Sequence, residues 1–147
     1  MAVKELYRQQ VKALATGNTE QASRMNAELP AEDRAGFNLF LSAVFATLMD
    51  RRFSDNLTRD ALAAFANELC REFQDSGVAL QPLTVEGIIR GSAGETHLLE
   101  GIDPEDIIGT QVLSIAKISA EDPTVGSEID SLLDEAEELV GDWEHEE

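Results

Sequence analysis

Cysteine and histidine are almost absent from this chain of 147 residues. It has one cysteine, Cys70, and two histidines, His97 and His145. A single cysteine cannot form an internal disulfide, so the sequence favours a reducing compartment, and we expect a cytoplasmic protein. The same scarcity leaves too few side chains for a zinc site. Neither a metal ion nor another cofactor is expected.

Long apolar runs are also missing. The longest uncharged stretch covers residues 35–49 and still contains Asn38, Ser42 and Thr47. A helix that spans a membrane needs about 20 apolar residues, so this stretch is better interpreted as a buried core helix. The N-terminus is charged from Lys4 onward and has no apolar core of a secretory signal, so no signal peptide is expected.

Basic residues are scarce in the C-terminal part of the chain. Residues 91–147 contain 17 acidic residues and one basic residue, Lys117, a net charge of −16, whereas residues 1–90 carry −2. The electrostatic field of so negative a surface repels phosphate groups and anionic lipids. Neither nucleic acid nor a membrane is therefore expected as a partner. It favours basic proteins or cations. A charge that serves only solubility, or reflects a salty cell, explains the same composition and stays an alternative.

Helical periodicity extends over most of the chain. The apolar patterns before and after Gly17 predict two helices joined as an antiparallel hairpin. A third helix, begun by Pro30, is apolar over most of its circumference and should lie at the centre of the fold. A fourth should follow a break near Ser54. The core of the central helix is predicted to contain Phe40, Leu41, Val44, Phe45 and Leu48.

The second half of the chain predicts two further long helices after an irregular segment. Residues 78–102 contain four glycines and Pro82, and should form a mobile connector with short helices at most. Asp103 is a typical N-cap residue, and the helix it begins should run to about Ser119. Its inward side chains are predicted to be Ile108, Val112 and Ile115. Residues 128–143 form an amphipathic helix with an almost wholly acidic outer face, and residues 144–147 should fray.

The predicted fold class is therefore all-α. We expect a compact single-domain bundle of five or six helices over residues 1–143. It should begin with the αα-hairpin, surround the central buried helix and end in the acidic C-terminal amphipathic helix.

The apolar stripe of the last helix must be covered by another surface. Its own core, a second copy of the chain or a groove on a foreign partner could supply that cover. If its own core does, the acidic face could approach a basic patch formed by Arg51, Arg52, Arg59 and Arg71. The candidate partner-binding residues are Glu128, Asp130, Asp134, Glu135, Glu138 and Trp143.

Candidate catalytic groups are few. Cys70, His97 and Asp103 are the one combination that could form a thiol dyad or triad. However, Cys70 lies in the interior of a predicted helix, where a small buried thiol is ordinary. The glycines of residues 87–101 lack the lysine and hydroxyl residue of a phosphate-binding loop. No catalytic residue is predicted.

These observations favour a non-enzymatic protein that acts through protein–protein contacts, in an interaction or regulatory role. One version is an acidic inhibitor or immunity-type protein that covers a basic surface, because opposite charges accelerate the encounter. Two alternatives stay open. The C-terminal helix could be the seam of a structural homodimer, or the chain could be an enzyme with a pocket near His97.

Overall fold

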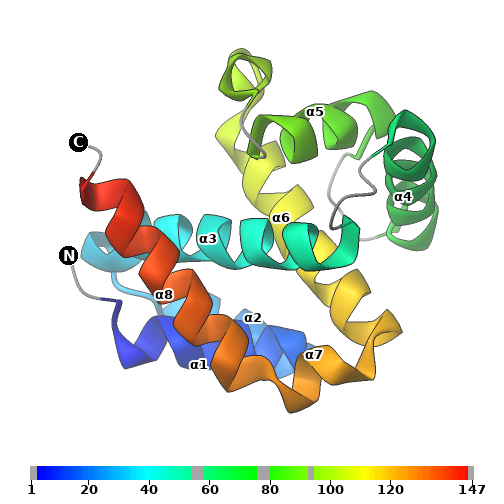
Figure 1. The fold of residues 1–147 in the computed structure, drawn as a ribbon. Coiled ribbons are helices and arrows are strands. Elements are labelled where there is room, and N and C mark those ends of the chain that lie inside the picture. Colours follow the sequence, from blue (N-terminus) through cyan, green and yellow to red (C-terminus); the bar gives the residue numbers. More distant parts are fainter. Residues whose placement is uncertain (1–2, 54–57, 76–79, 93–94, 146–147) are drawn as a thin grey trace.

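The computed structural model describes residues 3–53, 58–75, 80–92 and 95–145 (Figure 1). These residues form eight α-helices and two short 3-10 helices, and no strand occurs among them. The all-α prediction is confirmed, and the number of α-helices exceeds the five or six expected. Their bounds are α1 Glu5–Ala15, α2 Thr19–Glu28, η1 Ala31–Asp33, α3 Arg34–Phe53, α4 Arg59–Glu72, α5 Pro82–Ser92, η2 Thr96–Leu99, α6 Pro104–Glu121, α7 Pro123–Ser127 and α8 Ile129–His145.

Helices α1 and α2 form the predicted hairpin. Gly17 turns the chain with a φ of 82°, a left-handed conformation that glycine adopts without strain. Asn18 then caps α2 by accepting a hydrogen bond from the backbone N–H of Gln21 at 3.3 Å. A polar contact ties this hairpin to the start of α3, because Lys4 and Tyr7 both donate to the buried carboxylate of Asp33, at 2.6 and 2.8 Å.

The central helix is α3, which packs against both α6 and α8. Its predicted core residues are all buried, which confirms that part of the prediction. Burying such a side chain fully contributes about 1.5–3 kcal/mol, so α3 supplies much of the apolar stabilisation of the fold. The buried side chains of α3 are Phe37, Phe40, Leu41, Ala43, Val44, Phe45, Leu48, Met49 and Phe53.

Within the predicted connector, residues 82–92 form α5, which packs on α4 and on η2. Val85 and Ile88 of α5 belong to the core. Gly91 permits a close approach, because a Cβ atom there would lie 2.6 Å from Cγ of Leu99 in η2. The segment therefore contains a helix with core contacts, and its mobility stays a prediction.

Helix α6 begins at the predicted cap, where Asp103 accepts a hydrogen bond from the backbone N–H of Glu105 at 3.0 Å. Of the side chains predicted to point inward, Ile115 is buried, and Ile108 and Val112 are half-buried and pack against the core. Because α6 contacts helices on several sides, polar residues are buried as well, namely Thr110, Gln111, Ser114 and Lys117.

The acidic C-terminal helix is α8, and it packs on α3 of its own chain. The core of the same molecule therefore covers its apolar stripe. Residues 144 and 145 continue the helix, and 146–147 lie outside the described residues. None of the described helices is both long and apolar enough to span a membrane. The buried residues of the stripe are Ile129, Leu132, Leu133, Ala136 and Val140.

Candidate functional site

Six of the seven acidic residues of α8 lie in two rows, one on each side of the buried stripe. We call Asp130, Asp134 and Glu137 the paired row, and Glu135, Glu138 and Asp142 the open row. Members of each row are three or four residues apart, so each row follows one side of the helix for about two turns. The paired row faces α1, whereas the open row borders a groove beside α3.

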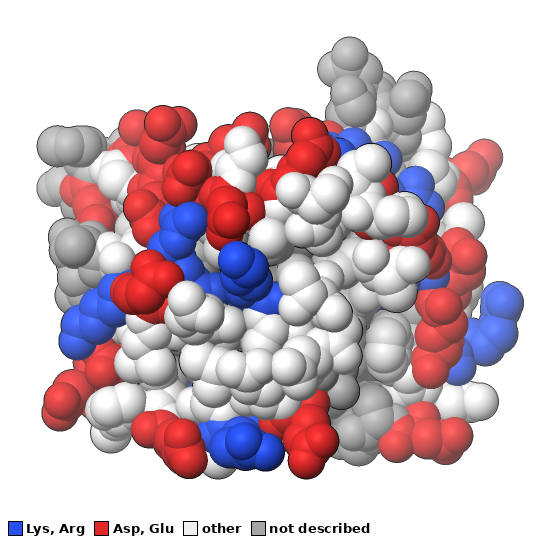
Figure 2. Space-filling view, turned by 90° about the horizontal axis from the view of Figure 1, so that it is seen from below, with Lys and Arg blue, Asp and Glu red and all other residues white. Residues whose placement is uncertain are grey.

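Basic side chains of α1 bind the paired row. Arg8 Nη1 lies 3.0 Å from carboxylate oxygens of both Asp134 and Glu137, and Lys12 Nζ lies 3.2 Å from Asp130. Burial alone would lower the pKa of the Arg8 guanidinium, but its hydrogen bonds with Glu137 and Asp134 raise it. Figure 2 shows basic and acidic side chains in direct contact on this face, beside a wide uncharged area. The paired row therefore has a structural role.

A third basic side chain, Arg51 of α3, holds the chain just before α8. Its Nη2 atom donates to Thr124 Oγ1 and to Glu128 Oε2, both at 2.6 Å. Asp122 lies nearby, and hydrogen bonds from the hydroxyl and the backbone N–H of Thr124 lower its pKa. Of the four arginines predicted to form a basic patch, Arg51 is the one that meets these acids.

The other three arginines of that predicted patch lie elsewhere. The Arg52 guanidinium lies over the Phe53 ring, 5.6 Å from its centroid. Arg59 and Arg71 are exposed and form no ion pair with the described residues. The predicted basic patch therefore does not form as a unit.

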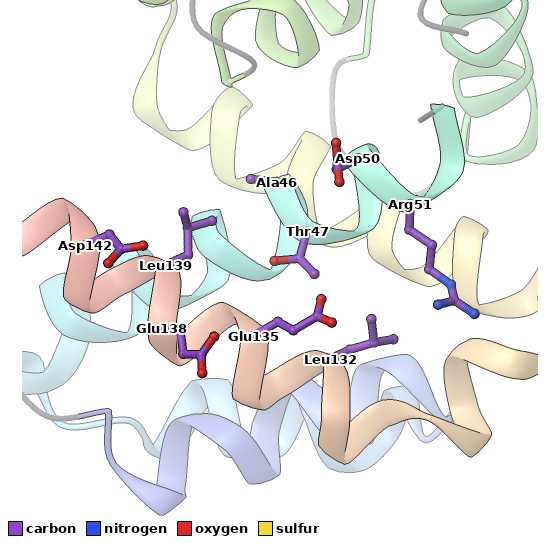
Figure 3. A pocket seen from close by; sticks show the side chains of 9 residues that line it. All are labelled: Ala46, Thr47, Asp50, Arg51, Leu132, Glu135, Glu138, Leu139 and Asp142. Atoms are coloured by element: carbon purple, nitrogen blue, oxygen red, sulfur yellow. The ribbon is translucent and has the colours of Figure 1, made fainter. Parts of the chain in front are cut away.

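The open row borders a groove of about 380 Å³ between α3 and α8. Figure 3 shows the carboxylate of Glu135 directed toward Thr47 of α3, and Arg51 at the far end of the groove. Four carboxylates line this groove, and its single basic side chain is already bound to Glu128. The lining residues are Ala46, Thr47, Asp50, Arg51, Leu132, Glu135, Glu138, Leu139 and Asp142.

The carboxylates of the groove have no partner within the described part of the chain. No hydrogen bond or ion pair joins Asp50, Glu135, Glu138 or Asp142 to any residue of that part. All four are exposed. The groove therefore combines concentrated negative charge with the apolar side chains of Ala46, Leu132 and Leu139.

The structure divides the predicted partner-binding residues among different environments. Glu128, Asp130 and Asp134 are paired with bases of the same chain, whereas Glu135 and Glu138 line the groove. Trp143 is half-buried against the core.

Two carboxylates of the groove, Asp50 and Asp142, were not among the predicted partner-binding residues. Asp142 follows Glu135 by seven residues, so helical spacing could have found it. Asp50 comes from α3, and no local pattern indicates that α3 lies beside α8.

Cys70, His97 and Asp103, the candidate thiol dyad or triad, lie on three different elements, α4, η2 and the start of α6. Asp103 caps α6, and His97 is exposed on η2. Burial raises the pKa of the Cys70 thiol, which is the opposite of what an activated nucleophile requires. No hydrogen bond joins these three side chains within the described residues. No group of three or more potential metal ligands occurs there either.

The structure has further hollows. One of about 620 Å³ is mainly apolar and lies where α1, α6, α7 and the C-terminal end of α4 meet.

Comparison with protein-family models, with curated proteins and with solved structures finds no match for this chain.

Proposed function

We propose that this is a non-enzymatic cytoplasmic protein that binds a basic segment of a partner protein in the groove between α3 and α8. The observation that supports the proposal most strongly is the difference between the acidic residues on the two sides of α8. The acids on one side of the helix are paired with α1, whereas those that line the groove have no partner among the described residues. Like charges held this close repel one another, and a cationic ligand would relieve that repulsion.

The clamp on Arg8 supports arginine as the favoured side chain of the partner. Asp134 and Glu137, three residues apart, hold one guanidinium atom at 3.0 Å from each carboxylate. Glu135 and Glu138 have the same spacing on the same helix. Arginine presents several N–H donors in a planar fork, so it can contact a further acceptor besides the two carboxylates, as Arg8 Nη2 does with the backbone oxygen of Asp130 at 3.4 Å.

The apolar residues of the groove suit the rest of such a side chain. Ala46 and Leu139, both half-buried, line it beside the carboxylates. The aliphatic stem of an arginine buries against apolar surface while its charged end stays at the polar rim. The partner segment should therefore combine arginines with apolar residues.

The net charge of the chain supports a role that depends on rapid encounter. With a net charge of −18, the protein attracts a cationic partner over distances well beyond contact. Electrostatic steering raises association rates more than it raises affinity, and salt weakens it. An acidic inhibitor or immunity-type protein that covers a basic surface is the version of this function that we favour.

A binding experiment with a defined probe tests the proposal. A fluorescent peptide rich in arginine and leucine is titrated with the parent protein and with the double variant Glu135→Gln, Glu138→Gln. We expect the affinity to fall by about tenfold, which corresponds to about 1.4 kcal/mol. A lysine peptide of equal charge and length should bind more weakly to the parent protein, because lysine lacks the planar fork.

The matched control removes the same charge elsewhere. Glu28 on α2 and Glu68 on α4 are exposed and form no ion pair within the described part of the chain. The double variant Glu28→Gln, Glu68→Gln should keep the parent affinity within about twofold, because it changes only the distant field. Equal losses in the two double variants would contradict the proposal, since they would show attraction to net charge without a site.

A further inference from the structure

The hollow where α1, α4, α6 and α7 meet is lined by uncharged residues alone, although the chain as a whole carries a net charge of −18. Its volume of about 620 Å³ falls within the range of about 300–1,000 Å³ that is typical of sites for small molecules. Figure 2 looks at the face that carries α1 and α7 and shows a wide uncharged area there. We call this hollow the apolar pocket, and its lining residues are Leu14, Ala15, Thr16, Gly17, Phe73, Ala116, Ser119, Ala120, Pro123, Gly126 and Ser127.

Three of the longer helices end at the apolar pocket. Leu14 and Ala15 lie in the last turn of α1, Phe73 directly follows α4, and Ser119 and Ala120 lie in the last turn of α6. The C-terminal end of a helix carries partial negative charge, and its last carbonyl oxygens have no partner within the helix. The pocket therefore lies where hydrogen-bond acceptors are concentrated.

At the end of α6, the sequence also removes the donors that a continued helix would supply. The backbone oxygen of Ser119 would accept a hydrogen bond from residue 123, but Pro123 has no N–H group. The backbone oxygen of Ala120 would accept one from Thr124, whose N–H group donates instead to Asp122 Oδ1 at 3.0 Å. Both Ser119 and Ala120 line the pocket, so a ligand that donates hydrogen bonds can replace the lost partners.

The hydroxyl groups of the lining offer acceptors as well. The Thr16 hydroxyl donates to the backbone oxygen of Lys12 at 2.7 Å, and the Ser127 hydroxyl donates to that of Thr124 at 3.1 Å. Each of these two hydroxyls has then used its single hydrogen and can only accept. Ser119 Oγ is buried and has no hydrogen-bond partner among the described residues. A serine hydroxyl changes position by rotation about one bond, so a ligand in the pocket can bind it and relieve an unpaired polar group.

We propose that the apolar pocket binds a small, mainly apolar molecule whose polar group donates a hydrogen bond and carries no negative charge, such as an aromatic alcohol. The half-buried side chains of Leu14, Phe73 and Ala116 contact its hydrocarbon part. Its donor group binds at Ser119, at the end of α6. An anion is excluded because the lining contains no basic side chain and the net charge of the chain repels it. This site shares no lining residue with the groove between α3 and α8.

Three probes of similar size test the proposal on the full chain. Thymol is an aromatic alcohol, p-cymene is the same molecule without the hydroxyl, and cuminate has a carboxylate in place of that hydroxyl. Thymol should shift the backbone amide resonances of Gly17 and Gly126, leave that of Glu135 unchanged, and saturate with a dissociation constant below about 1 mM. We expect p-cymene to bind about fivefold more weakly, because it lacks the donor. Cuminate should bind at least about tenfold more weakly, because of its charge.

Filling the pocket from an exposed position shows whether the probe occupies it. Ala120 is exposed, so Ala120→Phe can place a ring in the pocket without disturbing the core, and it should weaken thymol binding at least about tenfold. Ala64→Phe is the matched control, because Ala64 is an exposed alanine of α4 outside the lining. It should keep the parent affinity within about twofold.

A second pair of variants tests the contact with Ser119. Ser119→Ala should weaken thymol binding about two- to fivefold and leave the affinity for p-cymene unchanged. Ser114→Ala is the control, because Ser114 Oγ is also buried and unpaired but lies outside the pocket lining, and it should change neither affinity. Failure of thymol to saturate below about 1 mM, equal binding of thymol and cuminate, or equal effects of Ser119→Ala on thymol and p-cymene would overturn the proposal.

Discussion

The two acidic rows of α8 have the same number of carboxylates on the same helix, yet their surroundings differ. The paired row faces Arg8 and Lys12 of α1. The open row faces a part of α3 that presents Ala46, Thr47 and another acid, Asp50. An acidic segment of the sequence is therefore two surfaces in the fold. One is bound by the protein itself, and the other has no partner among the described residues.

The paired row fixes how α8 lies, whereas the buried stripe supplies most of its stability. Ion pairs at a surface contribute about 0–1 kcal/mol each. The contact of Arg8 should be at the upper end of that range, because its side chain is only 16% exposed and binds two carboxylates. Changes to the buried stripe, to the Arg8 contact and to the charge of each row should therefore have effects of decreasing size on stability.

Removing part of the buried stripe should affect both rows together. Leu133 is 1% exposed, and Leu133→Ala leaves a cavity beneath α8. We expect the free energy of unfolding to fall by about 2–5 kcal/mol, measured by urea denaturation. Leu83→Ala is the matched control, because Leu83 is 81% exposed and its truncation should change stability by less than about 0.5 kcal/mol. Similar losses in the two variants would show that α8 is not docked by its stripe.

The parts of the fold that depend on local patterns could be predicted from the sequence. Helical spacing identified α3 and its core, since every third or fourth residue falls on one face. Asp103 was identified as the cap of α6 because an aspartate followed by proline and two acids is a local signal. The stripe and the acidic face of α8 were found in the same way.

Features that depend on tertiary contacts could not be predicted. The glycines in and near α5 predicted a mobile connector, but Gly91 permits the side chain of Leu99 to approach the helix closely. Arg8 and Glu137 are separated by 129 residues, and nothing local indicates that they meet. Lys117 interrupts an apolar pattern, and its burial depends on carboxylates that α4 and α6 bring to it. The division of α8 into two rows depends on the same kind of contact.

Truncating the clamp on the paired row should have a smaller effect than opening a cavity. Arg8→Ala leaves Asp134 and Glu137 close together without their shared cation. We expect a loss of about 1 kcal/mol in the free energy of unfolding, decreasing as salt is added. Arg24→Ala is the control, since it removes one positive charge from a more exposed pair with Glu20. If both variants lost equal stability, the effect of Arg8 would be one of net charge and not of the clamp.

Neutralising each row without changing its shape should give the smallest effects, and they should have opposite signs. The double variant Glu135→Gln, Glu138→Gln relieves repulsion in the open row, so it should gain a few tenths of a kcal/mol at low salt. The double variant Asp134→Asn, Glu137→Gln removes the partners of Arg8 and should lose stability. Thermal unfolding at about 0.01 M salt measures both shifts, and each should shrink at about 0.15 M, where the Debye length is only ~8 Å. The parent protein itself should gain stability over the same range of salt, because its net charge of −18 outweighs the few attractive pairs on α8. A parent that loses stability as salt is added would show that the attractive pairs dominate. Shifts of the same sign in the two double variants would mean that the two rows are electrostatically equivalent. The proposal that the open row binds a basic partner would then lose its support.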